Sequence, residues 1–295
     1  YKDMSPVLLP RGFTKNYLDG HYDEVDFYQK IKDSYKRIAH DKDFTLVEGT
    51  GHIGVGSIAN MNNAQVAKLL GLSVVLISSG GIGKAFDDLA LNYALLKQHG
   101  VKVSGVILNR VQQDKYDMIV NYVSKALKRW KVPLIGCIPF NNLLSTFSMK
   151  DFENLFHTEL ISGEEHRFHH FADIRLVAIF SKNFAKHIKD NQLIITSATR
   201  SDVVSLVLDK HKKAQKEGLK PQYGMILTGH KPPEGSLLKK IQKTDVPIMY
   251  APHSNYGVMR RITSHTAKII NEDTDKVNQA ISLVENNINL DLLCP

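Results

Sequence analysis

Short apolar runs rich in β-branched residues alternate with helical segments along the first half of the chain, and this alternation constrains the fold most. The expected strands are residues 44–48, 73–78, 103–108 and 134–138. Segments with helical spacing separate them, and two of these end at a glycine, Gly71 or Gly100. Strands joined in this way lie parallel and are buried on both faces of a sheet. The pattern therefore predicts an α/β fold with a doubly wound parallel sheet.

A second series of strands and helices follows and predicts a second, smaller α/β domain. Its expected strands are residues 173–179, 193–196, 223–227 and 246–250, and its helices are residues 202–217, 235–243, 256–266 and 273–287. We place the boundary near Asp151, which gives domains of residues 1–150 and 151–295. Residues 1–22 hold two prolines and two glycines and are expected to form an irregular arm.

Glycines crowd the end of the first expected strand. Glu48 ends this strand, and four glycines, Gly49, Gly51, Gly54 and Gly56, follow within eight residues. Ligands of open α/β sheets bind at the carboxyl ends of strands, and glycines there let backbone N–H groups approach an anion. A Gly-rich turn with no chemical role is an equally good interpretation. His52, inside this loop, is expected to make a structural hydrogen bond.

The next strand runs into a turn that partly matches a phosphate-binding loop, whose pattern is G-x-x-x-x-G-K-[ST]. Gly83 and Lys84 match, but Ser78 stands at the first glycine and Ala85 at the hydroxyl. The turn is therefore no Walker A loop. Its amides, those of Gly81 and Gly83 included, can still face a phosphate. A plain strand-to-helix turn is the alternative.

In the second domain, polar residues follow two expected strands at their carboxyl ends. Arg200 and Asp202 follow one strand, and Thr228 and Gly229 follow another. Arginine offers a forked donor that suits carboxylate or phosphate, so these four residues are ligand candidates. The alternative is a helix cap at Ser201 with Arg200 on the surface.

Composition narrows the classes of partner. The net charge is +8, but the nine lysines among residues 205–245 stand without arginine on two expected helices, which favours solvated faces over a nucleic-acid groove. Residues 164–170 hold acidic and histidine residues without metal-ligand spacing and are expected to be an exposed polar stretch.

No membrane span or signal peptide is expected. Cys137 and Cys294 make no disulfide framework, so the expected setting is cytoplasmic.

Several motifs resemble the dethiobiotin synthetase-like P-loop ATPases, especially those fused to a DRTGG domain in the N-terminal region of long phosphotransacetylases. In the first domain the motifs are VEGTGHIGVGS (47–57), NNAQVAKLLG (62–71), SSGGIGKAFDDLALN (78–92) and GVILNRV (105–111). In the second domain they are ITSATRSDVV (195–204) and MILTGH (225–230). The resemblance covers nearly the whole chain.

This resemblance implies a P-loop NTPase-like fold that uses ATP and Mg²⁺. Glu48 matches the acidic residue beside the magnesium and the substrate, so it is both the implied catalytic and the implied metal residue. Asn109 matches the asparagine that reads adenine, and Gly49 and Gly51 match the loop near the phosphates. The implied second substrate is a small-molecule carboxylate or amine, and the implied assembly is a homodimer.

The sequence departs from the family in two places. The Walker A loop is missing from the printed sequence, and its expected place is upstream of Tyr1. Residues 199–202 read Thr-Arg-Ser-Asp and residues 229–230 read Gly-His, where the name-giving motif has Asp-Arg-Thr and Gly-Gly. Two hypotheses follow: an ATP-binding ATPase or ligase of unknown substrate, and a non-catalytic nucleotide-sensing regulatory module.

Overall fold

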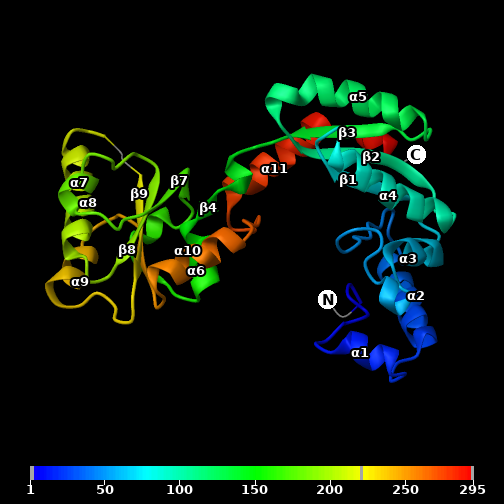
Figure 1. The fold of residues 1–295 in the computed structure, drawn as a ribbon, viewed down its shortest axis with the longest axis horizontal. Helices are drawn as coiled ribbons and strands as arrows, with labels where there is room; N and C mark the ends of the chain where they lie inside the picture. The colour runs from blue at the N-terminus through cyan, green and yellow to red at the C-terminus, as the bar shows by residue number, and fades with distance from the viewer. Residues whose placement is uncertain (1–2, 220–221, 294–295) are drawn as a thin grey trace. The chain divides into compact units, whose positions relative to one another are not determined.

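The chain divides into two compact units. The structure, a computed structural model, describes residues 3–219 and 222–293; Tyr1 and Cys294 lie outside these ranges. Unit 1 comprises Tyr1–Phe140 and Ser282–Pro295, and unit 2 comprises Asn141–Ile281 (Figure 1). No helix within the described ranges is both long and apolar enough to cross a membrane.

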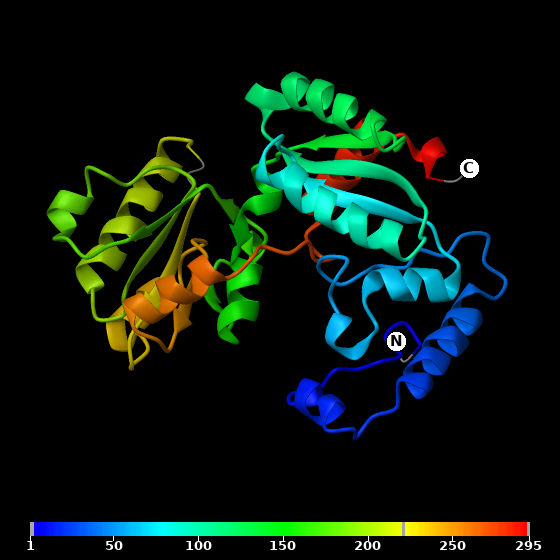
Figure 2. The same cartoon turned by 45° about the vertical axis from the view of Figure 1, so that its right-hand side comes forward.

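Unit 1 is built around a small parallel sheet. Its three strands run in the order β1 (Val74–Ser79), β2 (Val103–Val111) and β3 (Leu134–Pro139), and both pairs are parallel. Helices α4 (Lys84–Gln98) and α5 (Tyr116–Lys128) connect them (Figure 2). Three helices precede the sheet: α1 (Phe13–Leu18), α2 (Glu24–Ala39) and α3 (Asn63–Leu70). The α/β class and the order of strands and helices from residue 63 to residue 139 are confirmed.

The core of unit 1 follows the helical spacing of the sequence. Leu76, Val106 and Leu108 of the strands pack against apolar faces of α3, α4 and α5. Gly136 of β3 lies against the end of α11 (Thr274–Asn287), where an added Cβ would lie 2.7 Å from Asn287 O and 2.8 Å from Ile288 Cγ1. Glycine at this position therefore allows the C-terminal segment to approach the sheet closely.

Two expectations for the first domain were wrong. Residues 44–48 form no strand, and Phe44 and Leu46 are 61% and 83% exposed. A β-branched run becomes a strand only when a neighbour pairs with its backbone, and no described strand lies beside it. The irregular arm contains α1, because Phe13 is buried against Phe27 and Ala59 and fixes that turn of chain.

Unit 2 has a five-stranded sheet. The strand order is β5 (Leu160–Ser162), β10 (Ile248–Ala251), β9 (Tyr223–Thr228), β8 (Gln192–Ser197) and β7 (Asp173–Leu176). The last four are parallel to one another, and β5 pairs antiparallel to β10. A separate short ladder joins β4 (Phe147–Ser148) to β6 (His170–Phe171). Sequence patterning missed β4, β5 and β6, because runs of two or three residues have no readable period.

Both faces of this sheet are buried. On one face, Ile194, Met225 and Ile248 pack in a core with residues of α8 (Ser201–Lys216) and α9 (Gly235–Ile241). Their chain neighbours Leu193, Ile226 and Met249 face another core with α6 (Met149–Phe156) and α10 (Asn255–Ser264). Figure 1 shows these helix pairs on opposite sides of the sheet, and α7 (Ser181–Phe184) lies beside α8. Alternating burial of this kind is the reason these strands read as continuous apolar runs.

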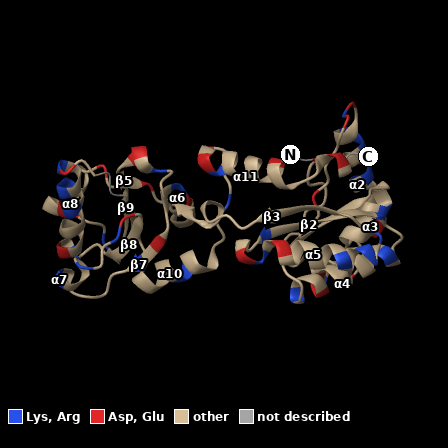
Figure 3. Cartoon of the chain, turned by 90° about the horizontal axis from the view of Figure 1, so that it is seen from above, with Lys and Arg blue, Asp and Glu red and all other residues tan. Residues whose placement is uncertain are grey.

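Lysines on the helices of unit 2 contribute to the positive net charge of the chain. On α8, Asp202 lies in the first turn and Lys213 and Lys216 lie in the last, and Figure 3 shows residues of both charge signs on this helix. Lys210 Nζ donates to Ile188 O, and Lys240 Nζ lies 3.0 Å from Asp209. These lysines serve local contacts of unit 2.

Candidate functional site

Gly80 joins the ends of β1 and β2 in unit 1. The Gly80 N–H donates to Asn109 O at 3.0 Å, and Asn109 pairs with Ser79 across the sheet. An added Cβ at Gly80 would lie 2.5 Å from Val111 Cγ2, so only glycine fits between the strands. Asn109 is half-buried. The structure thus brings Asn109 beside the turn that contains Gly81 and Gly83.

The same turn leads into a long helix with an open N-terminus. Gly83 is the N-cap of α4, and no side chain caps its first turn. Uncapped N–H groups of a 15-residue helix favour an anion at this end. Lys84, at the first helical position, is exposed. The turn can therefore present backbone donors to a phosphate, although it is no Walker A loop.

The loop after Glu48 is held on the start of α3. Asn63 Nδ2 donates to Thr50 O at 3.1 Å and to His52 O at 2.9 Å. His52 Nδ1 accepts from the Gly54 N–H, so its expected structural hydrogen bond is confirmed.

Glu48, Gly49 and Gly51 are exposed. Gly51 has φ +65°, a conformation that favours glycine, and an added Cβ at Gly49 would lie 3.1 Å from Asn63 Cγ. Within residues 3–219 and 222–293, no hydrogen bond or ion pair engages Glu48 or joins it to the turn beside Asn109. The structure therefore groups Asn109 with one glycine turn and Glu48 with another.

In unit 2, the four candidates lie where β8 and β9 end, but their polar groups are engaged locally. Thr228 is buried, and its hydroxyl donates to Asn255. Gly229 has φ +123° and donates its N–H to His253 O. Figure 1 marks this edge by the ends of the β8 and β9 arrows.

Arg200 and Asp202 bind each other. Arg200 Nε and Nη2 donate to the two carboxylate oxygens of Asp202 at 2.8 and 2.9 Å, and Nη2 also donates to Ile179 O. The hydrogen bonds from Arg200 lower the pKa of Asp202 well below its usual range. Arg200 is the N-cap of α8, which begins at Ser201. The guanidinium fork thus lies against a carboxylate of its own loop.

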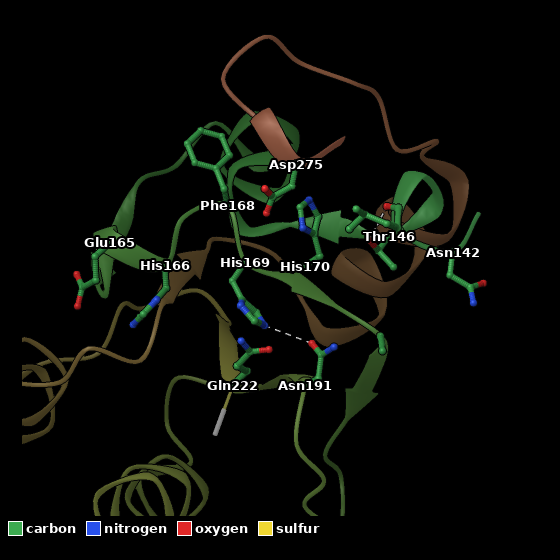
Figure 4. A pocket seen from close by; sticks show the side chains of 12 residues that line it. Asn142, Thr146, Glu165, His166, Phe168, His169, His170, Asn191, Gln222 and Asp275 are labelled. Carbon is green, nitrogen blue, oxygen red and sulfur yellow. Dashed lines mark hydrogen bonds between the residues drawn. The ribbon is translucent and has the colours of Figure 1, made fainter. Parts of the chain in front are cut away.

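A cavity of about 560 Å³ lies at the opposite edge of the unit 2 sheet. We call it the histidine cavity, because three of its lining residues are histidines: His166, His169 and His170 (Figure 4). Asn191 and Gln222 stand directly before β8 and β9, so the cavity lies at the amino ends of the parallel strands. Its lining residues are Asn142, Leu143, Thr146, Glu165, His166, Phe168, His169, His170, Ala172, Asn191, Gln222 and Asp275.

One wall of the histidine cavity is backed by a buried ionic cluster. His170 Nε2 lies 2.7 Å from Asp273 Oδ2. The fully buried Lys276 donates from Nζ to Thr146 O at 2.7 Å and lies 3.5 Å from Asp151 Oδ2. Asp273 accepts from the Lys276 N–H and so caps the first turn of α11. The cluster fixes the start of α11 on the cavity wall.

Sequence reasoning missed this cavity. Residues 164–166 of the acidic and histidine-rich segment are exposed as expected, but residues 167–170 are half-buried and most of the segment lines the cavity. Among the described residues, no group of three or more His, Cys, Asp or Glu is arranged to hold a metal ion. The rule of strand carboxyl ends directs attention to the opposite edge of the sheet. The available signal was the density of histidines.

Two α/β units, one of them with a glycine turn beside a strand-end asparagine, agree with the P-loop ATPase-like class that the motifs resemble. Residues 1–148 match the family described as AAA domain, and residues 153–265 match the family described as DRTGG domain. The chain therefore belongs to the AAA domain family and carries a DRTGG domain behind it. The resemblance stated from the motifs is confirmed.

Curated relatives match either nearly the whole chain or about half of it. A phosphate acetyltransferase of Synechocystis sp. is 26% identical, over 92% of this chain and 39% of its own length, and one of Pseudomonas aeruginosa is 24% identical, over 98% and 43%. An ATP-dependent dethiobiotin synthetase BioD of Clostridium perfringens is 29% identical, over 52% of this chain and 64% of its own length. The chain thus spans about two fifths of the phosphate acetyltransferases it matches.

One solved structure is a weak match. It contains the CBS and DRTGG domains of the regulatory region of Clostridium perfringens pyrophosphatase with the activator diadenosine tetraphosphate. It covers 71% of this chain and 86% of its own, at 12% identity and a TM-score of 0.33. At this TM-score, the likeness does not bear on the ligand of the present chain.

Proposed function

We propose that unit 1 binds ATP at the ends of β1 and β2. The observation that carries this proposal is the hydrogen bond from the Gly80 N–H to Asn109 O. This bond holds Asn109 next to the turn whose backbone amides suit phosphates. The Asn109 side chain is a carboxamide, which can both donate and accept hydrogen bonds, as recognition of an adenine edge requires. Asn109 reads the base, and Gly81 and Gly83 approach the phosphates at the start of α4.

Two separate features of unit 1 support the proposal of a magnesium nucleotide. The uncapped first turn of α4 offers donors to phosphate oxygens, and Glu48 is an exposed carboxylate that no described residue engages. Glu48 holds Mg²⁺, with Gly49 and Gly51 letting the backbone approach the nucleotide. A bound Mg²⁺ neutralises charge that develops on phosphate oxygens during phosphoryl transfer. What this chain itself contributes is positioning, and Glu48 is its proposed catalytic residue.

Calorimetric titration of Mg-ATP into the 295-residue chain tests the site. We expect Asn109→Ala to weaken ATP binding by about tenfold, the loss of about 1.4 kcal/mol expected for a base contact. Asn121→Ala, an exposed asparagine on α5, is the matched control and should bind normally. Equal affinity of the Asn109 and Asn121 variants would remove Asn109 from the site.

A second function is favoured by the way in which the relatives match. Phosphate acetyltransferases cover 92% and 98% of this chain, so the two domains occur together within longer proteins. This supports a non-catalytic module that senses nucleotide and regulates a larger enzyme. If the chain is instead an ATPase or ligase, it also has a second substrate, a small-molecule carboxylate or amine, and Mg-ATP activates that substrate.

Turnover separates the two functions. For the ATPase, phosphate release from Mg-ATP should be measurable and should fall at least about tenfold in Glu48→Gln. Asp43→Asn, at a nearby exposed carboxylate, should keep full activity. Binding without phosphate release, with or without added small carboxylates or amines, is the result expected of the sensing module. We propose a cytoplasmic homodimer in either case, and sedimentation velocity checks the dimer.

A further inference from the structure

The histidine cavity has the size and chemistry of a small-molecule site. Its volume of about 560 Å³ falls within the roughly 300–1,000 Å³ of typical ligand pockets. Half of its lining residues carry either a carboxamide or an imidazole. Both groups can donate and accept hydrogen bonds. The wall therefore suits a ligand that carries donors and acceptors close together.

The charge of the wall excludes strongly anionic ligands. No lysine or arginine is among the described lining residues, although the chain carries 38 of them. The charged groups present are Glu165 and Asp275, and both residues are exposed at the rim. Two carboxylates repel a di- or triphosphate. A neutral ligand meets no such barrier.

The central imidazole is set to accept a hydrogen bond from a ligand. His169 Nε2 lies 3.3 Å from Asn191 Oδ1, the contact drawn in Figure 4. With Oδ1 as the acceptor, Nε2 carries the proton and Nδ1 is left as an acceptor. Burial lowers the pKa of His169, which keeps this ring neutral at neutral pH. Phe168, also on the wall, adds a flat apolar face.

Two residues that line the cavity also contact the buried ionic cluster at the start of α11. His170 and Thr146 line the cavity, and both contact the buried ionic cluster that holds Lys276 and Asp273. A ligand that packs on these residues restrains the first turn of α11. Binding in the cavity therefore has a structural readout away from the ligand itself.

We propose that the histidine cavity binds a neutral, planar nitrogen heterocycle, of the class of a nucleobase or a nucleoside without phosphates. Carboxamides and imidazoles pair with the edge of such a ring, and Phe168 stacks on its face. This site is separate from the proposed ATP site of unit 1 and does not depend on it.

Titration of adenosine and cytidine tests this proposal in the full chain carrying Asn109→Ala, which suppresses base recognition in unit 1. We expect at least one nucleoside to bind, and Asn191→Ala or His166→Ala added to this background to weaken it about tenfold. His166 is exposed, so its variant keeps the fold. His187→Ala, an exposed histidine outside the cavity, is the matched control.

Three results would overturn the proposal: neither nucleoside binds, binding is unchanged in both cavity variants, or ATP binds the cavity more tightly than adenosine. Hydrogen exchange of residues 273–277 provides the second measurement, with slower exchange expected when the nucleoside is bound. Asn191→Ala in the otherwise natural chain should leave Mg-ATP binding by unit 1 unchanged. The experiments therefore distinguish failure of the proposed nucleoside site in unit 2 from failure of the proposed ATP site in unit 1.

Discussion

Lys276 is the residue whose environment departs most from its usual one. Lysine is almost never fully buried without partners, yet this side chain has no exposed surface. Its ammonium lies 3.5 Å from Asp151 Oδ2 and 3.9 Å from Asp273 Oδ2, and it donates to a backbone carbonyl. Two buried carboxylates therefore share this one ammonium, and Asp273 also contacts His170.

Replacing this cation should strongly destabilise unit 2. Lys276→Met keeps the length of the side chain but removes the ammonium from Asp151 and leaves Asp273 with His170 as its side-chain partner. We expect a loss of about 3–5 kcal/mol in the free energy of unfolding, measured by urea denaturation. Lys213→Met, on an exposed lysine of α8, should change it by less than about 0.5 kcal/mol. A loss for Lys276→Met no larger than that for Lys213→Met would contradict this account of the buried cluster.

His169 should make stability depend on pH. Burial lowers its pKa in the folded chain, so the unfolded chain, with an ordinary value near about 6.5, binds the proton first. Stability is thus fully present above about pH 6.5 and is lost as the pH falls through the lower folded value. We expect His169→Gln to reduce the stability lost between about pH 7.5 and about pH 5.5, measured by urea denaturation. The exposed His187→Gln should leave the pH profile as it is.

At the scale of single elements, α3 depends on its start signal. Asn62 caps the helix by accepting from the Gln65 N–H at 2.9 Å, and Gln65 Oε1 accepts from the Asn62 N–H at 3.0 Å. This capping box also orients the loop that begins at Glu48, because Asn62 Nδ2 donates to Ser57 Oγ.

Removing the cap should weaken α3 and its loop. We expect Asn62→Ala to lower the free energy of unfolding of unit 1 by about 1 kcal/mol, because an N-terminal N–H of the helix loses its partner. Asn62→Ser, which retains an acceptor oxygen, should recover most of the loss. Denaturation followed by fluorescence measures both variants. Equal losses in both would show that the contact with Ser57, rather than the cap, is what matters.

At the scale of the whole molecule, two cores suggest two unfolding transitions. The buried clusters of unit 1 and unit 2 share no residue. The only tryptophan, Trp130, packs on Tyr93 in unit 1 with ring centroids 4.3 Å apart. Tryptophan fluorescence therefore reports unit 1, whereas far-UV circular dichroism reports both units.

We expect these two probes to give transitions that do not coincide. Lys276→Met should shift the dichroism transition and leave the fluorescence midpoint in place, and Asn62→Ala should shift the fluorescence midpoint. Coincident, equally shifted curves would show that the molecule unfolds as one cooperative unit.

The sequence predicted most of the elements, and its failures have physical causes. Helices with 3.6-residue spacing and a glycine end, such as α3 with Gly71 in the left-handed conformation, were placed within a few residues. Residues 44–48 had the composition of a strand, but no described strand pairs with them. The short strands β4, β5 and β6 have partners far along the chain, which no local pattern reveals.

The sequence by itself determined the α/β class, the order of the main elements and the two families, because apolar periodicity and glycine turns are local properties. Only the tertiary structure decided which polar residues are engaged. Arg200 binds Asp202 instead of offering a free fork, Gly80 fits between β1 and β2 beside Asn109, and the histidines before β7 line a cavity. Each of these contacts joins side chains or strands from separate parts of the chain. The packing of the whole unit therefore decides whether the contact forms.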